Sequence, residues 1–406
     1  MTLDTGYVVK TNINKIFRQM PVLLHQLDIE LTERCNYGCI HCYINRPSGD
    51  REALRRELDT AQVKRILDEA AAIGVLTVRL TGGEVLLRRD FAELYLYARG
   101  LGLRVLIYTN GSLITPELAD LFARVPPLEK IEITSYGMRA ESYEAVTTVR
   151  DSFKDFRRGI KLLLERRIPF LVKGMLLPQN INEVEVFDAW AKTLPDMDSA
   201  PSYDVTVTMR GRRDSDAKNK MIERLRAAPN QVLPVVSRDR EAYLKEMKSF
   251  CSQFLGPHGD KLFTCGAGSS SVSVDAYGTL QPCMKLRQPG MGYDLKSGTI
   301  TDALTKVFPH LKEMRATNPD YLARCAKCFL RALCEQCPAM SWMETGTLDT
   351  PVEYLCQATH AKAVDLGLLD LGEKGWEVSN WKERIDRMSP AREIPISHQS
   401  KGEKDL

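Results

Sequence analysis

The segment Cys35-Asn36-Tyr37-Gly38-Cys39-Ile40-His41-Cys42 places three thiols within eight residues. At this spacing one loop can turn all three side chains inward onto a single centre, and thiolates bind zinc or iron–sulfur clusters. A structural zinc ion would need a fourth ligand, and none follows Cys42 closely. His41 stands between two of the cysteines, where its ring cannot easily reach the same metal. The spacing therefore favours a 4Fe-4S cluster in which one iron has no protein ligand.

The number and distribution of cysteines support a metal-binding role. Eleven cysteines stand in the chain, three of them in this loop and none between residues 43 and 250. The other eight are Cys251, Cys265, Cys283, Cys325, Cys328, Cys334, Cys337 and Cys356. In a small secreted protein this number would indicate disulfides, but in a cytoplasmic protein of this size it indicates metal binding or catalysis.

Composition excludes several classes of protein. The chain has 406 residues, 44% of them hydrophobic, which is enough for a sizeable core and two or three domains. Lys and Arg outnumber Asp and Glu by only 56 to 53, so the net charge gives no argument for nucleic acid. No apolar stretch is long enough to span a bilayer, and the N-terminus lacks a signal-peptide pattern. We expect a cytoplasmic protein with no nucleic-acid or membrane partner.

Apolar strands alternate with amphipathic helices through the first half of the chain. The sequence predicts strands at 27–31, 77–81, 104–109, 130–135, 170–177 and 204–209. It predicts helices at 60–73, 90–101, 115–124, 152–166 and 184–194. Six such units imply an α/β fold, a partial (β/α)6 TIM-like barrel with its helices outside. Ligands of these sheets bind at the carboxyl ends of the strands.

The chain divides into five segments. They are an N-terminal arm (1–26), the partial barrel (27–210), a charged helical bridge (211–250), a cysteine-rich iron–sulfur domain (251–370) and a C-terminal tail (371–406). The bridge is expected to hold helices at 221–228 and 240–250. In the cysteine-rich domain metals would replace a large core. The tail is polar from residue 389 onward and is expected to be disordered there.

Small and polar residues stand at the predicted strand ends. The cysteine loop follows the first strand, and Thr81-Gly82-Gly83-Glu84 follows the second. Asn110 and Ser135 end later strands, and Lys173 lies on the fifth. Glycines lack Cβ atoms and let the backbone come close to a ligand. These residues are candidate ligand contacts, although Asn110 and Ser135 would also serve as plain caps of strand ends, and Lys173 as a structural lysine.

The cysteine loop and the Gly82-Gly83-Glu84 turn resemble the CxxxCxxC and GGE motifs of the radical S-adenosylmethionine (SAM) enzymes, with His41 where that family usually has an aromatic residue. The resemblance implies a 4Fe-4S cluster on catalytic Cys35, Cys39 and Cys42. SAM would bind the open iron and be cleaved to methionine and a 5′-deoxyadenosyl radical. The residues expected to contact SAM are His41, Gly82, Gly83, Glu84, Asn110, Ser135 and Lys173.

The later cysteines resemble the SPASM domain that follows many radical SAM barrels and holds two auxiliary 4Fe-4S clusters. One departure is that two residues separate Cys334 from Cys337, where the family usually has three. The resemblance assigns one cluster to Cys265, Cys283 and Cys337 and the other to Cys325, Cys328, Cys334 and Cys356. Cys251 is expected to complete the first cluster, and the alternative is an ordinary buried thiol. A zinc ribbon is an alternative for the four closely spaced cysteines.

Enzymes with this SPASM arrangement are mostly peptide and protein maturases. The resemblance therefore implies a radical SAM oxidoreductase that abstracts hydrogen from a ribosomally synthesised peptide and installs a crosslink, a thioether or an epimerised centre. Its partners would be the peptide, a separate leader-peptide recognition protein, and an electron donor such as flavodoxin or ferredoxin.

Three alternatives to the peptide maturase remain open. The first is a dehydrogenase or decarboxylase of a small molecule or haem precursor. The second is a sulfatase-type maturase, which Met284 opposes because such enzymes have Asp at that position. The third is a non-catalytic iron–sulfur electron-transfer protein.

Overall fold

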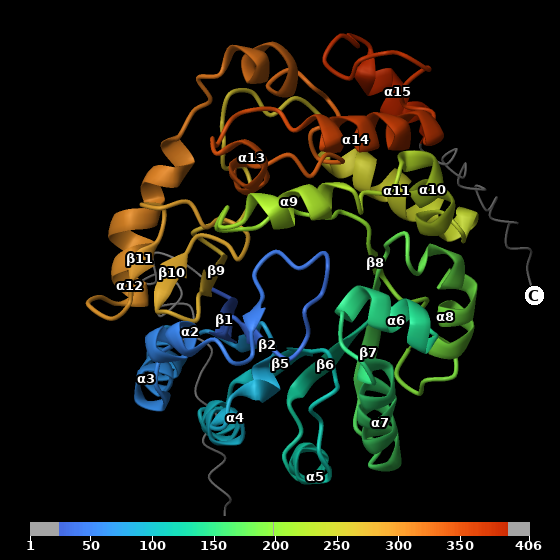
Figure 1. The fold of residues 1–406 in the computed structure, drawn as a ribbon. Helices are drawn as coiled ribbons and strands as arrows, with labels where there is room; N and C mark the ends of the chain where they lie inside the picture. Colours follow the sequence, from blue (N-terminus) through green and yellow to red (C-terminus); the bar gives the residue numbers. More distant parts are fainter. Residues whose placement is uncertain (1–23, 198, 389–406) are drawn as a thin grey trace, which may run out of the picture.

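The computed structural model describes residues 24–197 and 199–388. Most of the predicted N-terminal arm and the predicted disordered tail from residue 389 lie outside this part of the chain. Within it, no helix is long and apolar enough to cross a membrane. The described chain builds one large sheet with helices on its outer side, and the cysteine-rich region runs from one edge of this sheet across the top of the view towards the other edge (Figure 1).

The sheet contains nine strands in the order β11-β10-β9-β1-β4-β5-β6-β7-β8. The barrel strands are β1 (Gln26–Thr32), β4 (Thr77–Gly82), β5 (Arg104–Thr109), β6 (Leu128–Ser135), β7 (Phe170–Met175) and β8 (Tyr203–Asp204). Each of these strands pairs in parallel with the next. The predicted α/β fold with a partial TIM-like barrel is therefore confirmed.

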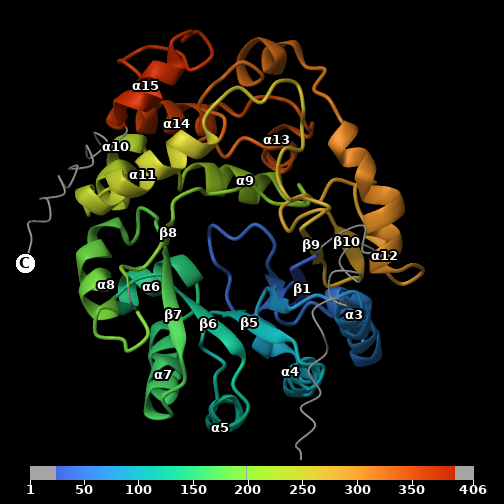
Figure 2. The same cartoon turned by 180° about the vertical axis from the view of Figure 1, so that it is seen from behind.

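Helices cover the outer face of the barrel sheet, as Figure 2 shows from behind. They are α3 (Thr60–Ala72), α4 (Phe91–Gly100), α5 (Pro116–Arg124), α7 (Ser152–Glu165) and α8 (Val184–Ala191). Asp59 starts α3 through a reciprocal capping box with Gln62, which satisfies free N–H groups of the first turn. Val63, Ile66 and Leu67 form the buried stripe that packs α3 into the core.

The two faces of the sheet differ in polarity because strand side chains alternate. On β1, the apolar Leu27, Ile29 and Leu31 belong to the core shared with the helices. Asp28 and Glu30 alternate with them and therefore face the barrel interior. The interior of the partial barrel thus carries charged groups, whereas the outer face is apolar.

The sixth strand is much shorter than predicted. Pairing ends at Asp204, although the sequence predicts a strand at 204–209. Val207 and Met209 pack instead with Met340 and Leu355 in a separate apolar cluster. Burial against the C-terminal helices therefore takes these residues out of the sheet at its edge.

The predicted helix at 221–228 is wrong. Helix α9 (Asp216–Glu223) ends within it, and α10 (Pro229–Val236) begins after it. Ala228 is extended, with φ −68° and ψ 150°, because a residue before proline disfavours helical backbone. Helix α11 (Arg240–Phe254) runs past its predicted end at residue 250.

Several short elements lie where none is predicted. They are β2 (Arg34–Cys35), β3 (Arg46–Pro47), α2 (Arg51–Arg56), α6 (Ala140–Thr147), η1 (Val85–Leu87) and η2 (Ile181–Glu183). Helix α6 matters most for function because its C-terminal end contacts the cysteine loop. Its buried Tyr143 and Val146 stand three residues apart, a helical spacing that the sequence already contains.

The cysteine-rich region continues the barrel sheet. Strand β9 (Ser271–Val274) pairs in parallel with β1, and the antiparallel β10 (Thr279–Gln281) and β11 (Tyr293–Asp294) follow. Its helices and turns are α12 (Ile300–Asp302), η3 (Ala303–Val307), η4 (Phe308–Glu313), η5 (Tyr321–Cys325), α13 (Pro338–Thr345), α14 (Glu353–Asp365) and α15 (Trp381–Met388). Helix α15 lies inside the segment predicted as a tail. The domain boundaries stay predictions, but the barrel and this region share one sheet.

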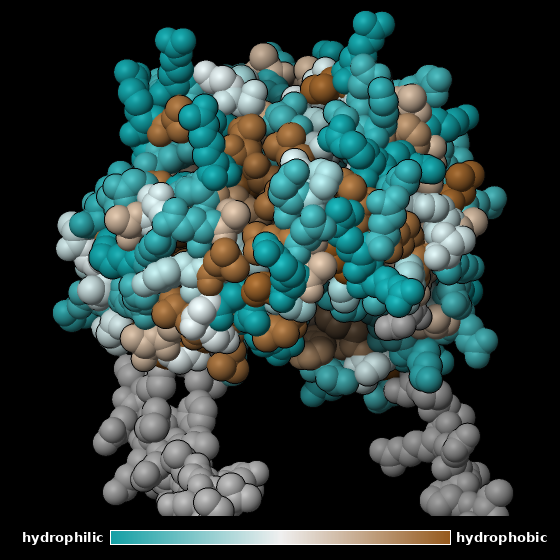
Figure 3. All heavy atoms as spheres, turned by 90° about the horizontal axis from the view of Figure 1, so that it is seen from below, coloured by the Kyte–Doolittle hydropathy of each residue, from teal (hydrophilic) through white to brown (hydrophobic). Residues whose placement is uncertain are grey.

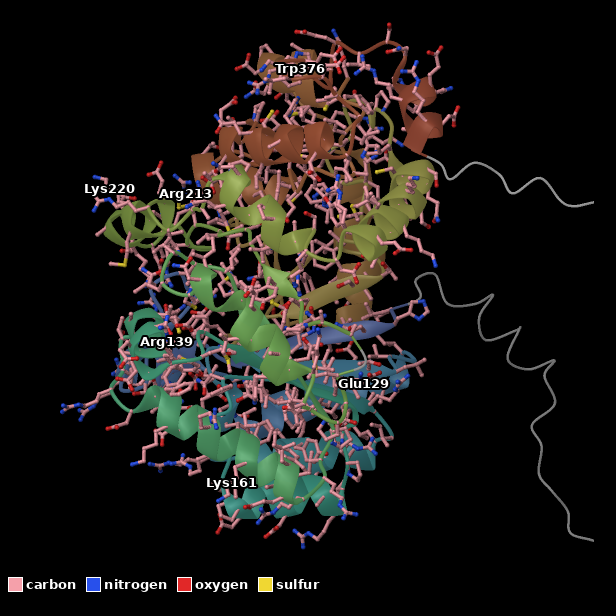
Figure 4. The ribbon with its side chains drawn as sticks, turned by 90° about the vertical axis from the view of Figure 1, so that its right-hand side faces the viewer. Glu129, Arg139, Lys161, Arg213, Lys220 and Trp376 are labelled. Carbon is pink, nitrogen blue, oxygen red and sulfur yellow. The ribbon has the colours of Figure 1, made fainter. Side chains whose placement is uncertain are left out.

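Side chains at the ends of the molecule mark its long direction. In Figure 4, Lys161 on α7 lies at one end, and Trp376, in the C-terminal region, lies at the other. Arg213 and Lys220 lie between them, at the level of α9. Seen from the side of α4 and α5, the surface is mostly hydrophilic at its edge, with apolar side chains towards the middle (Figure 3).

Candidate active site

Backbone contacts hold the cysteine loop at the carboxyl ends of the strands. The amide of Gly38 donates to the carbonyl oxygen of Thr147 over 2.9 Å, and the amide of Ile40 donates to that of Val146 over 2.9 Å. Both acceptors belong to the last turn of α6, whose carbonyls have no partner within the helix. The loop amides thereby satisfy free carbonyl groups at the end of α6, and α6 in turn fixes the position of the loop.

The three thiols of the loop lie close together and are largely buried. Burial raises the pKa of the Cys35 and Cys39 thiols well above their usual range, and the nearby Cys42 raises both further. The amide of Tyr37 donates to the Cys35 sulfur over 3.3 Å, a bond suited to a thiolate. Metal binding requires deprotonated thiols, so cluster binding would release protons here.

Two cations, one at the end of the predicted barrel segment and one in the predicted bridge, hold the outside of the loop. Lys218 Nζ donates to the Cys39 carbonyl oxygen over 2.8 Å, and Arg210 donates to that of Cys42 over 3.3 Å. Arg210 is itself held by Asp214 over 2.8 Å. Neither cation is predicted at the site from the sequence. Arg210 belongs to a basic run at 210–213 that is visible in the sequence. Its contact with the loop joins segments far apart in the chain, so the run alone does not predict it.

Another part of the backbone lies so close to the two glycines at the end of β4 that neither position has room for a side chain. A Cβ atom on Gly83 would lie 2.3 Å from the carbonyl oxygen of Arg34, and one on Gly82 would lie 2.1 Å from that of Thr32. Gly82 also has φ +131°, which side chains rarely adopt. The glycines therefore let β4 pack against the chain entering the cysteine loop. Their contact with SAM remains a prediction.

Glu84 joins the ends of two neighbouring strands. Its fully buried carboxylate accepts bonds from Thr109 Oγ1 and the Asn110 amide, each 2.8 Å, and from the Leu86 amide at 3.0 Å. Burial raises the pKa of this carboxyl, and the three donors oppose that shift. Glu84 thus fixes β5 relative to the turn after β4.

Asn110 lies beside the cysteine loop, where its place at a strand end predicts it. Its Nδ2 donates to Asn36 Oδ1 over 3.0 Å, and Asn36 Nδ2 donates to Ser112 Oγ over 2.8 Å. Asn36 and Ser112 are therefore site residues that the sequence analysis misses. Asn36 stands inside the motif itself, and its amide side chain is the signal that could have identified it.

His41 is neutral and has an unpaired ring nitrogen. Burial lowers the pKa of His41 to about 4, and the charge of Lys218 lowers it further. Its Nδ1 is buried without a hydrogen-bond partner among the described residues, and its ring centroid lies 5.5 Å from that of Tyr136. A neutral ring with one free nitrogen suits the predicted adenine contact, which stays a prediction.

Ser135 and Lys173 both have partners within the protein. Ser135 is buried and donates to the carbonyl oxygen of Gly137 over 3.1 Å. Lys173 Nζ lies 2.6 Å from Glu132 Oε2 and 3.5 Å from the centre of the Tyr108 ring. These contacts agree with the alternatives given above, in which Ser135 caps a strand end and Lys173 is a structural lysine. Their contacts with SAM remain predictions.

Four C-terminal cysteines line one cavity. Cys325, Cys328, Cys334 and Cys356 share it with Arg324 and Trp376, among others. Burial raises the pKa of Cys328 to about 12 and that of Cys325 to about 11, and other cysteines of the set raise both further. We call these four residues the second auxiliary set. Figure 4 shows Trp376, and so this region, far from α7.

Three further cysteines form the first auxiliary set, which comprises Cys265, Cys283 and Cys337. Burial raises the pKa of Cys283 to about 11, and Cys337 and Cys265 are close enough for their charges to raise it further. The grouping of the C-terminal thiols agrees with the two sets that the resemblance implies, despite the short spacing before Cys337, and their binding of clusters stays a prediction.

Cys251 does not join the first auxiliary set. Helix α11 extends to Phe254, so Cys251 lies inside the helix and not at the start of a flexible loop. Its side chain is fully buried in an apolar cluster with Met247 and Phe329. Burial raises the pKa of Cys251 to about 11, and the charged group acting on it is Lys362, not Cys283. The prediction that Cys251 completes this cluster is therefore wrong.

The donor sets fit iron–sulfur clusters. Each consists of thiols, the ligands that such clusters require. Within the described residues, no three His, Cys, Asp or Glu side chains are spaced to hold one metal ion. When bound on the loop thiols, a 4Fe-4S cluster would supply the electron that cleaves SAM, and the surrounding residues would hold and orient both groups.

Comparison with known proteins identifies the family. The pattern of the radical SAM superfamily matches residues 29–191, which contain the cysteine loop and the Gly82-Gly83-Glu84 turn. Residues 29–191 form a radical SAM domain. The chain thus contains a radical SAM domain, as the motifs predict, and radical SAM enzymes bind a 4Fe-4S cluster and SAM.

Two relatives and one solved structure show how far the similarity extends. An AdoMet-dependent heme synthase of Methanosarcina barkeri is 26% identical over 335 residues, which are 78% of this chain and 92% of the relative. The mycofactocin maturase MftC of Mycolicibacterium smegmatis is 35% identical over 163 residues, 40% of each protein. SuiB of Streptococcus suis, bound to its precursor peptide SuiA, shares the fold with a TM-score of 0.61 and 14% identity, over 85% of this chain and 80% of SuiB.

Proposed function

We propose that this radical SAM enzyme oxidises its substrate with the help of two auxiliary 4Fe-4S clusters. The observation that carries this proposal is the separation of the C-terminal cysteines into a set of three around Cys283 and a set of four around Cys328. A substrate that loses a hydrogen atom to the deoxyadenosyl radical must lose one more electron and a proton to become an oxidised product. The auxiliary sets would hold the groups that accept that electron.

The proposed substrate is a ribosomally synthesised peptide, in which a crosslink or thioether would form. The fold similarity to SuiB in its complex with a precursor peptide supports this substrate class. The 35% identity with mycofactocin maturase over 163 residues supports it as well. A peptide thiol could also reach the first auxiliary set, where no fourth cysteine is present.

A haem precursor is the second candidate substrate. The heme synthase similarity extends beyond the barrel, because it spans 78% of this chain. The mycofactocin maturase similarity covers only 40%. On such a substrate the same hydrogen abstraction would begin the loss of a propionate carboxylate as carbon dioxide.

One experiment separates these substrates. The anaerobically reconstituted enzyme is given SAM, a reductant and either a peptide encoded beside its gene or an iron porphyrin with propionate side chains. The Cys35/Cys39/Cys42→Ala variant is the matched control. A peptide lighter by two hydrogens supports the first candidate, and carbon dioxide release supports the second. Deoxyadenosine release with both substrates unchanged would contradict both candidates.

The auxiliary clusters are tested separately by iron content. Three 4Fe-4S clusters correspond to about twelve iron atoms per chain. A content of about four would show that only the cysteine loop binds a cluster, and the proposed oxidative function would then be wrong.

A further inference from the structure

Five charged side chains, four of them buried and Arg212 partly exposed, form one network between β1 and the cysteine-rich region. They are Glu30, Glu33, Arg212, Asp275 and Arg287. Glu33 is its centre: its carboxylate lies 2.8 Å from Arg212 Nη2 and 3.1 Å from Arg287 Nη1, and it accepts a bond from Tyr277 Oη over 2.9 Å. Arg212 also donates to Asp275 over 2.8 Å. All three donors to Glu33 come from the C-terminal half of the chain.

Arg287 joins two carboxylates through the two arms of its guanidinium. One arm contacts Glu30 on β1, and the other contacts Glu33. The side chains of all three residues are at most 1% exposed. Burial raises the pKa of Glu30 to about 7, and the charge of Arg287 opposes that shift. Glu30 therefore depends on Arg287 to carry its charge inside the protein.

The place of this network in the chain relates it to two cysteine sets. Glu33 stands two residues before Cys35, and Arg287 stands four residues after Cys283. The Arg287 guanidinium also lies 5.9 Å from the ring of Tyr43, the residue after Cys42. A single side chain thus connects the segment that carries Cys283 to both ends of the cysteine loop.

Stability alone is a weak explanation for this arrangement. A buried ion pair is often no more stabilising than apolar residues of the same volume, because two charges must leave water. Its directed bonds do fix the relative position of the groups that they join. Position matters here because a displacement of about 1 Å can lower the rate of a reaction about a hundredfold.

We propose that Arg287 is a positioning residue that fixes the first auxiliary set relative to the cysteine loop. This inference rests on the proposed auxiliary cluster at Cys265, Cys283 and Cys337. The guanidinium holds the Cys283 segment against β1 so that the electron from the substrate reaches that cluster.

Arg287→Lys tests this role because lysine keeps the charge but lacks the planar fork that spans two carboxylates. The matched control is Arg226→Lys, since Arg226 is also largely buried, pairs with Glu344 and donates to the Val207 carbonyl oxygen over 3.2 Å. The holoenzymes are compared by iron content, by electron paramagnetic resonance of the reduced clusters and by product formed per deoxyadenosine released. Hydrogen–deuterium exchange is measured over residues 26–35 and 283–293.

We expect Arg287→Lys to keep wild-type iron and deoxyadenosine release. Product per deoxyadenosine should fall at least about tenfold, within the range that misplacement causes. One auxiliary cluster signal should change, and exchange should rise in both segments. Arg226→Lys should show none of these changes. If Arg287→Lys does not fold, Glu30→Gln replaces it and should give the same changes.

Two results would overturn the inference, and they differ from each other. Unchanged cluster signals and exchange in Arg287→Lys, with about twelve iron atoms per wild-type chain, would refute the positioning role alone. If the Cys283→Ala variant contains as much iron as the wild type, no cluster is bound at Cys283. That result would refute the proposed auxiliary cluster and the inference together.

Discussion

The cysteine loop and the C-terminal cysteines bring their thiols together in different ways. In the loop, Cys35, Cys39 and Cys42 lie within one short segment, which α6 holds through two backbone bonds. The first auxiliary set takes Cys265 and Cys283 from either side of β9 and β10, and takes Cys337 from the start of α13. One short segment thus supplies all the thiols of the loop, although α6 holds its position, whereas the first auxiliary set takes its thiols from three distant segments.

Removal of the loop thiols should have the largest effect. Cys35/Cys39/Cys42→Ala should abolish deoxyadenosine formation because no cluster could deliver an electron to SAM. Iron should fall from about twelve to about eight per chain, since the C-terminal sets share no ligand with the loop. Deoxyadenosine assays and iron analysis check both numbers. Complete loss of iron would break the comparison, because it would show that the two regions assemble as one unit through the shared sheet.

The next largest effect is expected for Glu84, which links the ends of β4 and β5. Glu84→Ala leaves three buried donors without their acceptor, which should lower the free energy of unfolding by about 3 kcal/mol. SAM affinity should fall too, because Asn110 and the loop lose their support. Chemical denaturation measures the first effect and equilibrium dialysis the second. The control is Glu93→Ala, which removes an exposed pair with Lys64 and should cost about 0.5 kcal/mol or less. Equal losses in the two variants would contradict this role of Glu84.

His41→Ala should affect SAM and leave iron unchanged. Its ring is neutral and has a free Nδ1, so we expect a SAM contact and no metal bond. The dissociation constant of SAM should rise about tenfold, equivalent to about 1.4 kcal/mol. Isothermal titration and iron analysis of the same preparation separate the two quantities. Loss of iron with unchanged SAM affinity per remaining cluster would make His41 a ligand or a folding residue.

Cys251→Ala should have the smallest effect. The thiol lies in an apolar cluster, so its loss should cost about 1 kcal/mol of stability and leave iron, cluster signals and product formation unchanged. Resonance spectra of the variant and the wild type provide the check. A changed auxiliary signal would show that Cys251 is a ligand and that the first auxiliary set has four thiols.

The barrel could be predicted from the sequence because alternating strands and helices form a local pattern. Five of the barrel strands lie close to their predicted bounds. The family resemblance assigns the two auxiliary sets, and the grouping of their thiols agrees with that assignment. The Cys251 prediction failed because α11 extends to Phe254 and Cys251 is buried inside it, in one cluster with Met247 and Phe329. No spacing in the sequence contains that contact.

Long-range contacts could not be predicted from the sequence for the same reason. The pairing of β9 with β1 joins segments more than two hundred residues apart. The contact between Lys218 and the Cys39 carbonyl depends on where α9 crosses the loop. Such contacts are fixed by tertiary packing, which overrides local preference.

The most direct test of the account asks which cluster has an iron free for an added ligand. The Cys35/Cys39/Cys42→Ala variant removes the SAM cluster, so that only the two auxiliary clusters contribute to its resonance spectrum. Titration of the reduced variant with a small thiol should shift one cluster signal and leave the other unchanged, with about eight iron atoms per chain. Two unshifted signals, or about four iron atoms, would contradict the division of the C-terminal cysteines into a set of three and a set of four.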